Sequence, residues 1–239
     1  MHKRPGLVAT LAVLALCSGS VEAQRFYIGA SGGTTRVETD YVAQATREIE
    51  SPFSVNDFLA TGVTVDSRGT PWRLFAGLQL SEVFAVEADY TRLGNIQSSL
   101  QFRLRQGSFG HTQWDTRNEP EAFGVALLAR APLSHDVSLF GRAGVAHTRM
   151  KYSINVCQYL DAVSGPVGCG TGFRSEAEET RPVAGLGIDW RFAGGFALRA
   201  SWDRYFGVGK PFAIVGPLDK DTYGEYDIDY FAVGATYSF

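Results

Sequence analysis

The chain has 239 residues, of which 45% are hydrophobic, 20% charged and 13% aromatic, with 27 glycines and a formal net charge of −3. The near balance of 22 Lys and Arg against 25 Asp and Glu argues against a basic nucleic-acid-binding protein and against an acidic disordered chain. A mean hydropathy of −0.06 excludes a bundle of membrane helices. It is compatible with a transmembrane β-barrel, whose spanning strands are only half apolar.

The first 23 residues have the three parts of a secretory signal peptide. Lys3 and Arg4 precede an apolar run over 7–16, and small residues lead to Ala23. The apolar run is too short to cross a membrane as a helix. We therefore predict a cleaved signal peptide at 1–23 and a mature domain at 24–239.

Eight segments with alternating apolar and polar residues follow, as expected for strands with two different faces. They cover residues 24–35, 70–81, 83–94, 120–132, 137–151, 181–193, 195–206 and 226–239. The connections between them alternate between long and short, which is typical of an up-and-down antiparallel barrel in a membrane. The long ones are 36–69, 95–119, 152–180 and 207–225. The predicted fold is an all-β transmembrane barrel of eight antiparallel strands, with short periplasmic turns and long extracellular loops.

The two faces of these segments differ in chemistry. One face carries Phe, Trp, Leu, Val and Ala without a formal charge, and it is too bulky to fill the interior of eight strands. We therefore predict that it faces lipid, with aromatic belts near the strand ends. The other face is rich in glycine and carries charges that we predict to form a network in the lumen: Arg73, Glu87, Asp89, Arg130, Arg142, Asp189, Arg191, Arg199 and Asp203.

The lumen charges have two interpretations. Five arginines face four carboxylates, so that pairing would neutralise nearly all of them and seal the barrel. Alternatively, the charges line a polar path for ions or small solutes. The narrow bore of an eight-stranded barrel favours the sealed interior.

Two cysteines, Cys157 and Cys169, remain once the signal peptide is removed. In an exported chain, a single pair at this spacing predicts a disulfide, here in the third long connection. Two thiols without a nearby histidine do not make a structural zinc site. We expect neither a metal nor a cofactor.

Four segments carry a resemblance to a known family: 26–30 (FYIGA), 72–77 (WRLFAG), 84–90 (FAVEADY) and the last strand, 230–239. They resemble the eight-stranded outer-membrane β-barrels of Gram-negative bacteria, namely the OmpA-like transmembrane domain and the opacity-type surface proteins. The resemblance implies contacts with outer-membrane lipid and lipopolysaccharide. It also implies that the barrel assembly machinery recognises the apolar face of the last strand, which consists of Phe231, Val233, Ala235, Tyr237 and Phe239.

The long connections hold about half of the mature chain, more than is needed to reverse its direction. We therefore expect a monomeric surface protein with a structural or interaction role and, by analogy with the family, a ligand on a host or neighbouring cell. A narrow channel or carrier for small solutes is the first alternative. A lipid hydrolase that uses His147 is the second, but no catalytic motif supports it, and we predict that the protein is not an enzyme.

Overall fold

The computed structural model describes residues 25–38, 58–104, 110–161, 165–209 and 225–239, so the predicted signal peptide lies outside the described residues. Within these ranges one short 3-10 turn, Ala193–Gly195, accompanies ten strands. The strands are β1 (Phe26–Glu38), β2 (Phe58–Arg68), β3 (Trp72–Gln79), β4 (Phe84–Arg92), β5 (Asn95–Leu104), β6 (Gly110–Pro132), β7 (Val137–Leu160), β8 (Pro166–Arg191), β9 (Phe196–Val208) and β10 (Tyr226–Ser238). No helix in this described part is long and apolar enough to cross a membrane.

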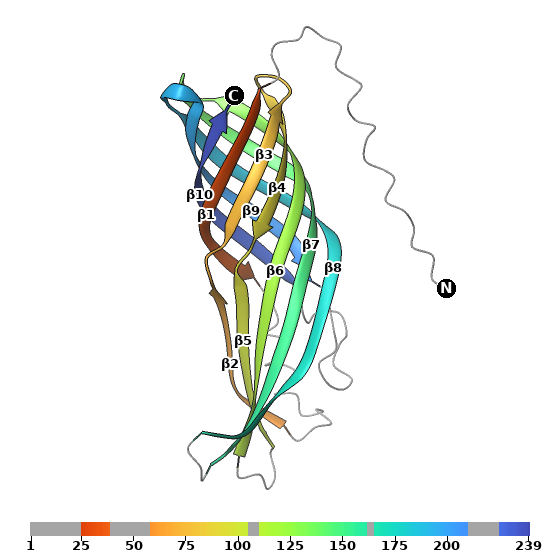
Figure 1. Cartoon of the computed structure of the whole chain (residues 1–239). Coiled ribbons are helices and arrows are strands. Elements are labelled where there is room, and N and C mark those ends of the chain that lie inside the picture. The colour runs from red at the N-terminus through yellow and green to blue at the C-terminus, as the bar shows by residue number, and fades with distance from the viewer. Residues whose placement is uncertain (1–24, 39–57, 105–109, 162–164, 210–224) are drawn as a thin grey trace, which may run out of the picture.

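Eight of the described strands close into an antiparallel ring, which confirms the predicted barrel (Figure 1). Around the ring the order is β1, β3, β4, β6, β7, β8, β9 and β10, and β10 pairs with β1. Each ring strand corresponds to one predicted segment, and the strand ends at the short turns agree with the prediction to within two residues. The ring leaves no open edge, because unpaired backbone groups in lipid would be costly.

The short connections are tight turns that lie at the same end of the barrel as the C-terminus (Figure 1). The hydroxyls of Ser81 and Ser134 each accept hydrogen bonds from backbone N–H groups of the next strand. Between β8 and β9, Gly194 and Gly195 both have a φ of 81°, a left-handed conformation that favours glycine. By the predicted topology this is the periplasmic end.

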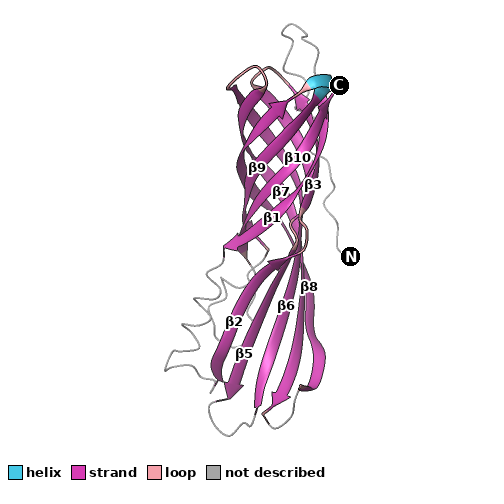
Figure 2. Cartoon of the chain, turned by 90° about the vertical axis from the view of Figure 1, so that its left-hand side faces the viewer, coloured by secondary structure: helices cyan, strands magenta, loops and turns pink. Residues whose placement is uncertain are grey.

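The largest difference from the predicted fold lies in the long connections, which we expected to be loops. Strands β6, β7 and β8 have 23, 24 and 26 residues and continue far beyond the ring. With β2 and β5 they form a five-stranded sheet, in the order β2, β5, β6, β7, β8, that projects from the end of the barrel opposite the turns (Figure 2). The hairpin of β5 and β6, in which Gln101 pairs with Gln113, is part of this sheet.

Strict alternation is not required throughout the projecting sheet because neither of its faces meets lipid. About 9–11 residues are enough for a strand to cross the membrane. The remaining part of each long strand pairs in water, where neither face has to be apolar. Residues 111–117 of β6, for example, read His, Thr, Gln, Trp, Asp, Thr and Arg, with polar side chains on both faces.

The outward side chains of the ring form the predicted apolar face. Leu74, Leu127, Leu186 and Val233 are between 50% and 66% exposed, although they lie in the middle of strands. In a soluble protein such side chains would be buried, and here lipid covers them. The inward side chains on the same strands are mostly buried, so the site described next lies inside the ring.

Candidate functional site in the barrel interior

The inward side chains form three layers along the barrel axis, which β4 shows most clearly. From the turn end outward, the inward residues of β4 are Ala85, Glu87, Asp89 and Thr91, Leu93 follows just beyond the strand, and none is more than 2% exposed. Ala85 belongs to an apolar cluster near the turns, whereas Leu93 belongs to a larger apolar cluster at the extracellular end. The two carboxylates therefore lie in a charged middle layer between two apolar layers.

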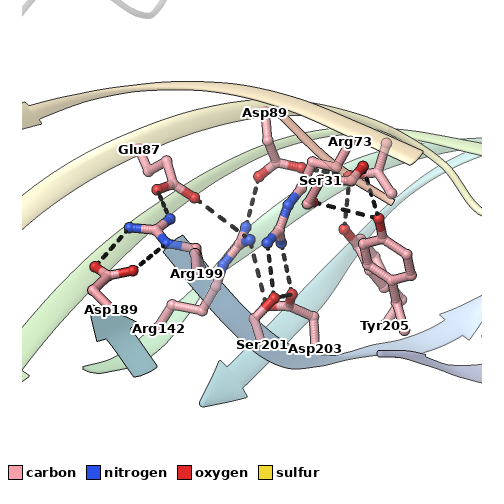
Figure 3. Close-up of polar contacts among 12 residues, drawn as sticks. Ser31, Arg73, Glu87, Asp89, Arg142, Asp189, Arg199, Ser201, Asp203 and Tyr205 are labelled. Carbon is pink, nitrogen blue, oxygen red and sulfur yellow. Dashed lines mark hydrogen bonds and ion pairs between the residues drawn. The ribbon is translucent and has the colours of Figure 1, made fainter. Parts of the chain in front are cut away.

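Arg199 on β9 spans the bore in the part of the middle layer nearest the turns (Figure 3). It donates to the two carboxylate oxygens of Asp189 on β8 at 2.7 and 3.1 Å and to Glu87 on β4 at 2.7 Å. Tyr27 also donates to Glu87, at 3.1 Å, and Arg130 lies 3.8 Å from Asp189. Because β4 and β9 are on opposite sides of the ring, this group joins the two walls.

Arg73 and Arg142 form the outer half of the charged layer (Figure 3). Arg73 on β3 donates to Asp203 at 2.6 Å and to Ser201 at 3.0 Å, both on β9. Arg142 on β7 donates to Asp89 on β4 at 2.6 Å, and its other terminal nitrogen lies 3.4 Å from Asp203. Each buried charge thus faces an opposite charge, as burial in a low dielectric requires.

One predicted member of the network, Arg191, lies outside it. This arginine is the last residue of β8, is exposed, and donates to the carbonyl of His135 in the neighbouring turn at 3.5 Å. Its parity along β8 is that of Asp189, but it lies at the end of the barrel, where its side chain reaches water. The structure brings the other eight predicted residues together as four arginines and four carboxylates, whose formal charges sum to zero.

Aromatic rings also contact the network, and the sequence-based prediction of the inner face did not include them. The Arg199 guanidinium lies 4.6 Å from the ring centre of Phe140 and 4.8 Å from that of Phe75, within range of cation–π attraction. Arg130 lies 5.0 Å from the ring of Tyr27. The signal that could have found these rings is a glycine at the paired position of the adjacent strand: Gly187 for Phe140, Gly29 for Phe75 and Gly77 for Tyr27.

Replacing Gly77 by alanine is expected to lower the free energy of unfolding by about 1–3 kcal/mol, because an added Cβ would overlap the ring of Tyr27. The measurement is urea unfolding of the protein folded into lipid vesicles. Gly170 in the projecting sheet is the control, since no atom lies within 4 Å of a Cβ built there. Equal losses in Gly77→Ala and Gly170→Ala would contradict the proposed packing.

The outer layer is apolar and aromatic, whereas we expected the inner face to be polar and glycine-rich. Tyr205 and Tyr230 are at most 1% exposed, and Met150 and Ile228 are fully buried beside them. The Tyr205 hydroxyl donates to Thr91 at 3.0 Å, which links this layer to the charged one. The interior is therefore filled with side chains on the extracellular side of the charges as well.

His147 lies on the outward face of β7 and is exposed, not in the lumen. Its Nδ1 is 3.4 Å from the hydroxyl of Thr180, and its Nε2 is 4.0 Å from Glu178. Glu178 also accepts a hydrogen bond from Arg149 at 2.9 Å, through its other carboxylate oxygen. No group of three or more His, Cys, Asp or Glu among the described residues could hold a metal ion.

The sequence matches the family model of the outer membrane protein β-barrel domain over residues 7–239. The chain belongs to this family. Its location is therefore the outer membrane of a Gram-negative bacterium. No curated protein matches the chain.

Several solved structures of barrels in this class are similar to the chain. Ail of Yersinia pestis is 15% identical with a TM-score of 0.46, and the match covers 90% of this chain and 99% of Ail. Neisserial surface protein A is 12% identical with a TM-score of 0.49, covering 90% and 97%. OprG of Pseudomonas aeruginosa is 12% identical with a TM-score of 0.46, covering 91% and 96%. These similarities concern the fold alone.

Two further predicted features lie at opposite ends of the family fold. Cys157 and Cys169 are paired across β7 and β8 and form a disulfide, which cross-links the projecting sheet rather than a loop. On β10, Phe231 and Val233 are 45% and 66% exposed on the lipid face, which continues to Phe239. The backbone N–H of Phe239 donates to the carbonyl of Phe26 at 2.9 Å and so completes the ring at the turn end.

Proposed function

We propose that the protein is a monomeric, sealed outer-membrane barrel that presents its extracellular sheet as an interaction surface. The observation that supports the seal is the charged layer. Arg73, Arg142 and Arg199 are at most 3% exposed, and their hydrogen bonds reach from wall to wall across the bore. An eight-stranded barrel has room for such side chains and little else, and apolar layers cover them on both sides.

The projecting sheet supports the interaction role. Three of its strands are more than twice as long as the membrane requires, and a disulfide joins two of them. Along 166–182, β8 pairs with β7 on one side, and no other described strand pairs with its opposite edge. An ordered sheet held outside the cell is suited to contact a ligand on a host or neighbouring cell, and it is more than a connection between strands.

The sealed lumen predicts that the purified protein gives no stable conductance step in planar lipid bilayers. The physical reason is that an ion would have to displace buried, paired charges. Single-channel recording of the wild-type protein is the measurement, and a known porin in the same bilayers is the positive control. A stable step of porin size from the wild-type protein would overturn the seal and support the channel alternative.

The interaction role has its own experiment. A barrel in which short turns replace 95–119 and 152–180 keeps the membrane-spanning part of the ring strands and loses most of the sheet. Bacteria that display the full protein are expected to adhere to host or bacterial cells more than bacteria that display the trimmed barrel. Equal adherence at equal surface amounts would count against this role.

The remaining proposals concern the membrane partners and catalysis. We propose that the outward face of β10 is the segment recognised by the barrel assembly machinery, and that outer-membrane lipid and lipopolysaccharide contact the barrel wall. The protein is proposed to have no catalytic activity. Hydrolysis of a labelled lipid that is lost in His147→Ala would instead support the hydrolase alternative.

A further inference from the structure

The disulfide lies in the outer part of the projecting sheet, well outside the membrane (Figure 2). Val145 on β7 still belongs to the apolar face that lipid covers. A strand rises about 3.3 Å per residue, so Cys157 is about 40 Å farther along β7 than Val145. The bond between Cys157 and Cys169 is therefore surrounded by the extracellular medium.

Cys169 is the accessible half of this bond. It is exposed, whereas Cys157 is half-buried. Along 166–182, the strand that carries Cys169 pairs with β7 alone among the described strands, so its other edge is free. Gly168 and Gly170 flank Cys169, and no atom lies within 4 Å of a Cβ built on either glycine. A small reagent can therefore reach the Sγ of Cys169 from the free edge of the sheet.

The neighbours of the disulfide in its own row of the sheet are uncharged. Cys157 pairs with Cys169 on one side and with Gln113 on the other, and Gln113 pairs in turn with Gln101. Gln101 donates a hydrogen bond to Gln113 at 3.1 Å. Across the described strands this row contains no carboxylate, so no side chain directly beside the bond repels an anionic thiolate.

The segment of β8 that the disulfide holds, 165–172, has little strand propensity of its own. It contains four glycines and Pro166, and both residue types weaken a strand. Its pairing with β7 shifts register on each side of the disulfide, and only residues 155–158 of β7 are paired in succession between the two shifts. The covalent bond therefore contributes much of what holds this segment against β7.

We propose that the Cys157–Cys169 disulfide is an exchange site for small extracellular thiols, and that the exchange releases 165–172 from β7. The incoming thiolate attacks the Sγ of Cys169, and a new S–S bond forms there as the bond to Cys157 breaks. The electron pair leaves on the Sγ of Cys157, which takes up a proton from water at neutral pH, as most free thiols do. The product is a mixed disulfide on Cys169 and a thiol on Cys157, without net oxidation or reduction.

This exchange site goes beyond the proposed interaction role and does not depend on it. Adherence is measured between cells, whereas exchange is measured on the purified protein. Failure of one experiment therefore leaves the other proposal standing.

The first test is exchange with glutathione, on the full-length protein folded in detergent at neutral pH. The reaction is stopped with N-ethylmaleimide, and peptide mass spectrometry identifies the group on each cysteine. The reference is the same protein unfolded in urea, where neither cysteine is shielded. The folded protein is expected to react within about tenfold of the rate of the unfolded protein, because exposed disulfides are the labile ones. Early in the reaction glutathione is expected on Cys169 and N-ethylmaleimide on Cys157.

A slower reaction of the folded protein than this would overturn the exchange site. Glutathione found on Cys157 as often as on Cys169, or more often, would overturn the assignment of Cys169 as the attacked half.

The second test follows the release of 165–172 by hydrogen–deuterium exchange. Reduction is expected to lower the protection of its amides about tenfold or more, and to leave the ring residues 183–191 unchanged. Cys157→Ser/Cys169→Ser is expected to behave like the reduced wild type. The matched control is Gly168→Val/Gly170→Val, which raises strand propensity where a side chain has space and is expected to keep its protection after reduction. Unchanged protection in the reduced wild type, or an equal loss in the valine variant, would overturn the release.

Discussion

Replacing Arg199 by leucine is expected to lower the free energy of unfolding by about 3–5 kcal/mol. The guanidinium is 2% exposed and makes three hydrogen bonds, to Glu87 and Asp189. Its removal leaves these two carboxylates buried without their nearest cation. Urea unfolding of the protein folded into lipid vesicles, followed by tryptophan fluorescence, measures the change.

Arg191→Leu provides the matched control, because this arginine lies on the same side of β8 as Asp189 but is exposed at the barrel end. Its replacement is expected to change the free energy of unfolding by less than about 0.5 kcal/mol. Adding Glu87→Gln to Arg199→Leu removes one of the two carboxylates that lose Arg199 and is expected to recover part of the loss of stability. Similar losses in the two single variants would mean that the buried network is not what stabilises the interior.

The membrane-spanning part of the fold could be predicted because lipid imposes a strict rule on the sequence. Every second side chain must be apolar, so Phe84, Val86 and Ala88 alternate with buried Ala85 and Glu87, and the pattern ends where the lipid ends. At the turn end of the barrel, the alternating pattern predicted where each strand begins or ends to within two residues. In the projecting sheet water replaces lipid and both faces tolerate polar residues, so β2, β5 and the outer parts of β6, β7 and β8 were predicted as long connections.

Alternation assigns a side chain to a face but does not give its height in the barrel or its partner. Arg191 and Asp189 share a face, yet only Asp189 is within reach of the network. Pairing across the bore depends on the stagger of the strands, which places Glu87 opposite Arg199 although they are 112 positions apart. The inward rings of Tyr27 and Phe75 were missed because the inner face was described only by its charged residues and its glycines.

Replacing Leu127 by lysine is expected to lower the free energy of unfolding by about 2–4 kcal/mol, because the substitution places a charge near the bilayer midplane. Leu127 is the middle of the outward positions on β6 and is 50% exposed. Val233 on β10 is equally central and 66% exposed, and it is expected to give a similar loss. Leu78 lies near a turn, so its replacement by lysine is expected to cost less, since the penalty falls toward the interface.

The control for this series is Asn155→Lys, at an exposed position of β7 in the projecting sheet, which is expected to leave stability within about 0.5 kcal/mol of the wild type. All four variants add one lysine to an outward or solvent-facing position, so their differences report depth and not charge alone. The loss in free energy of unfolding is expected to be greatest at Leu127 and Val233, smaller at Leu78 and absent at Asn155. This order would show that a band of hydrocarbon surrounds the ring. Equal tolerance of lysine at all four positions would refute the assignment of the apolar face to lipid.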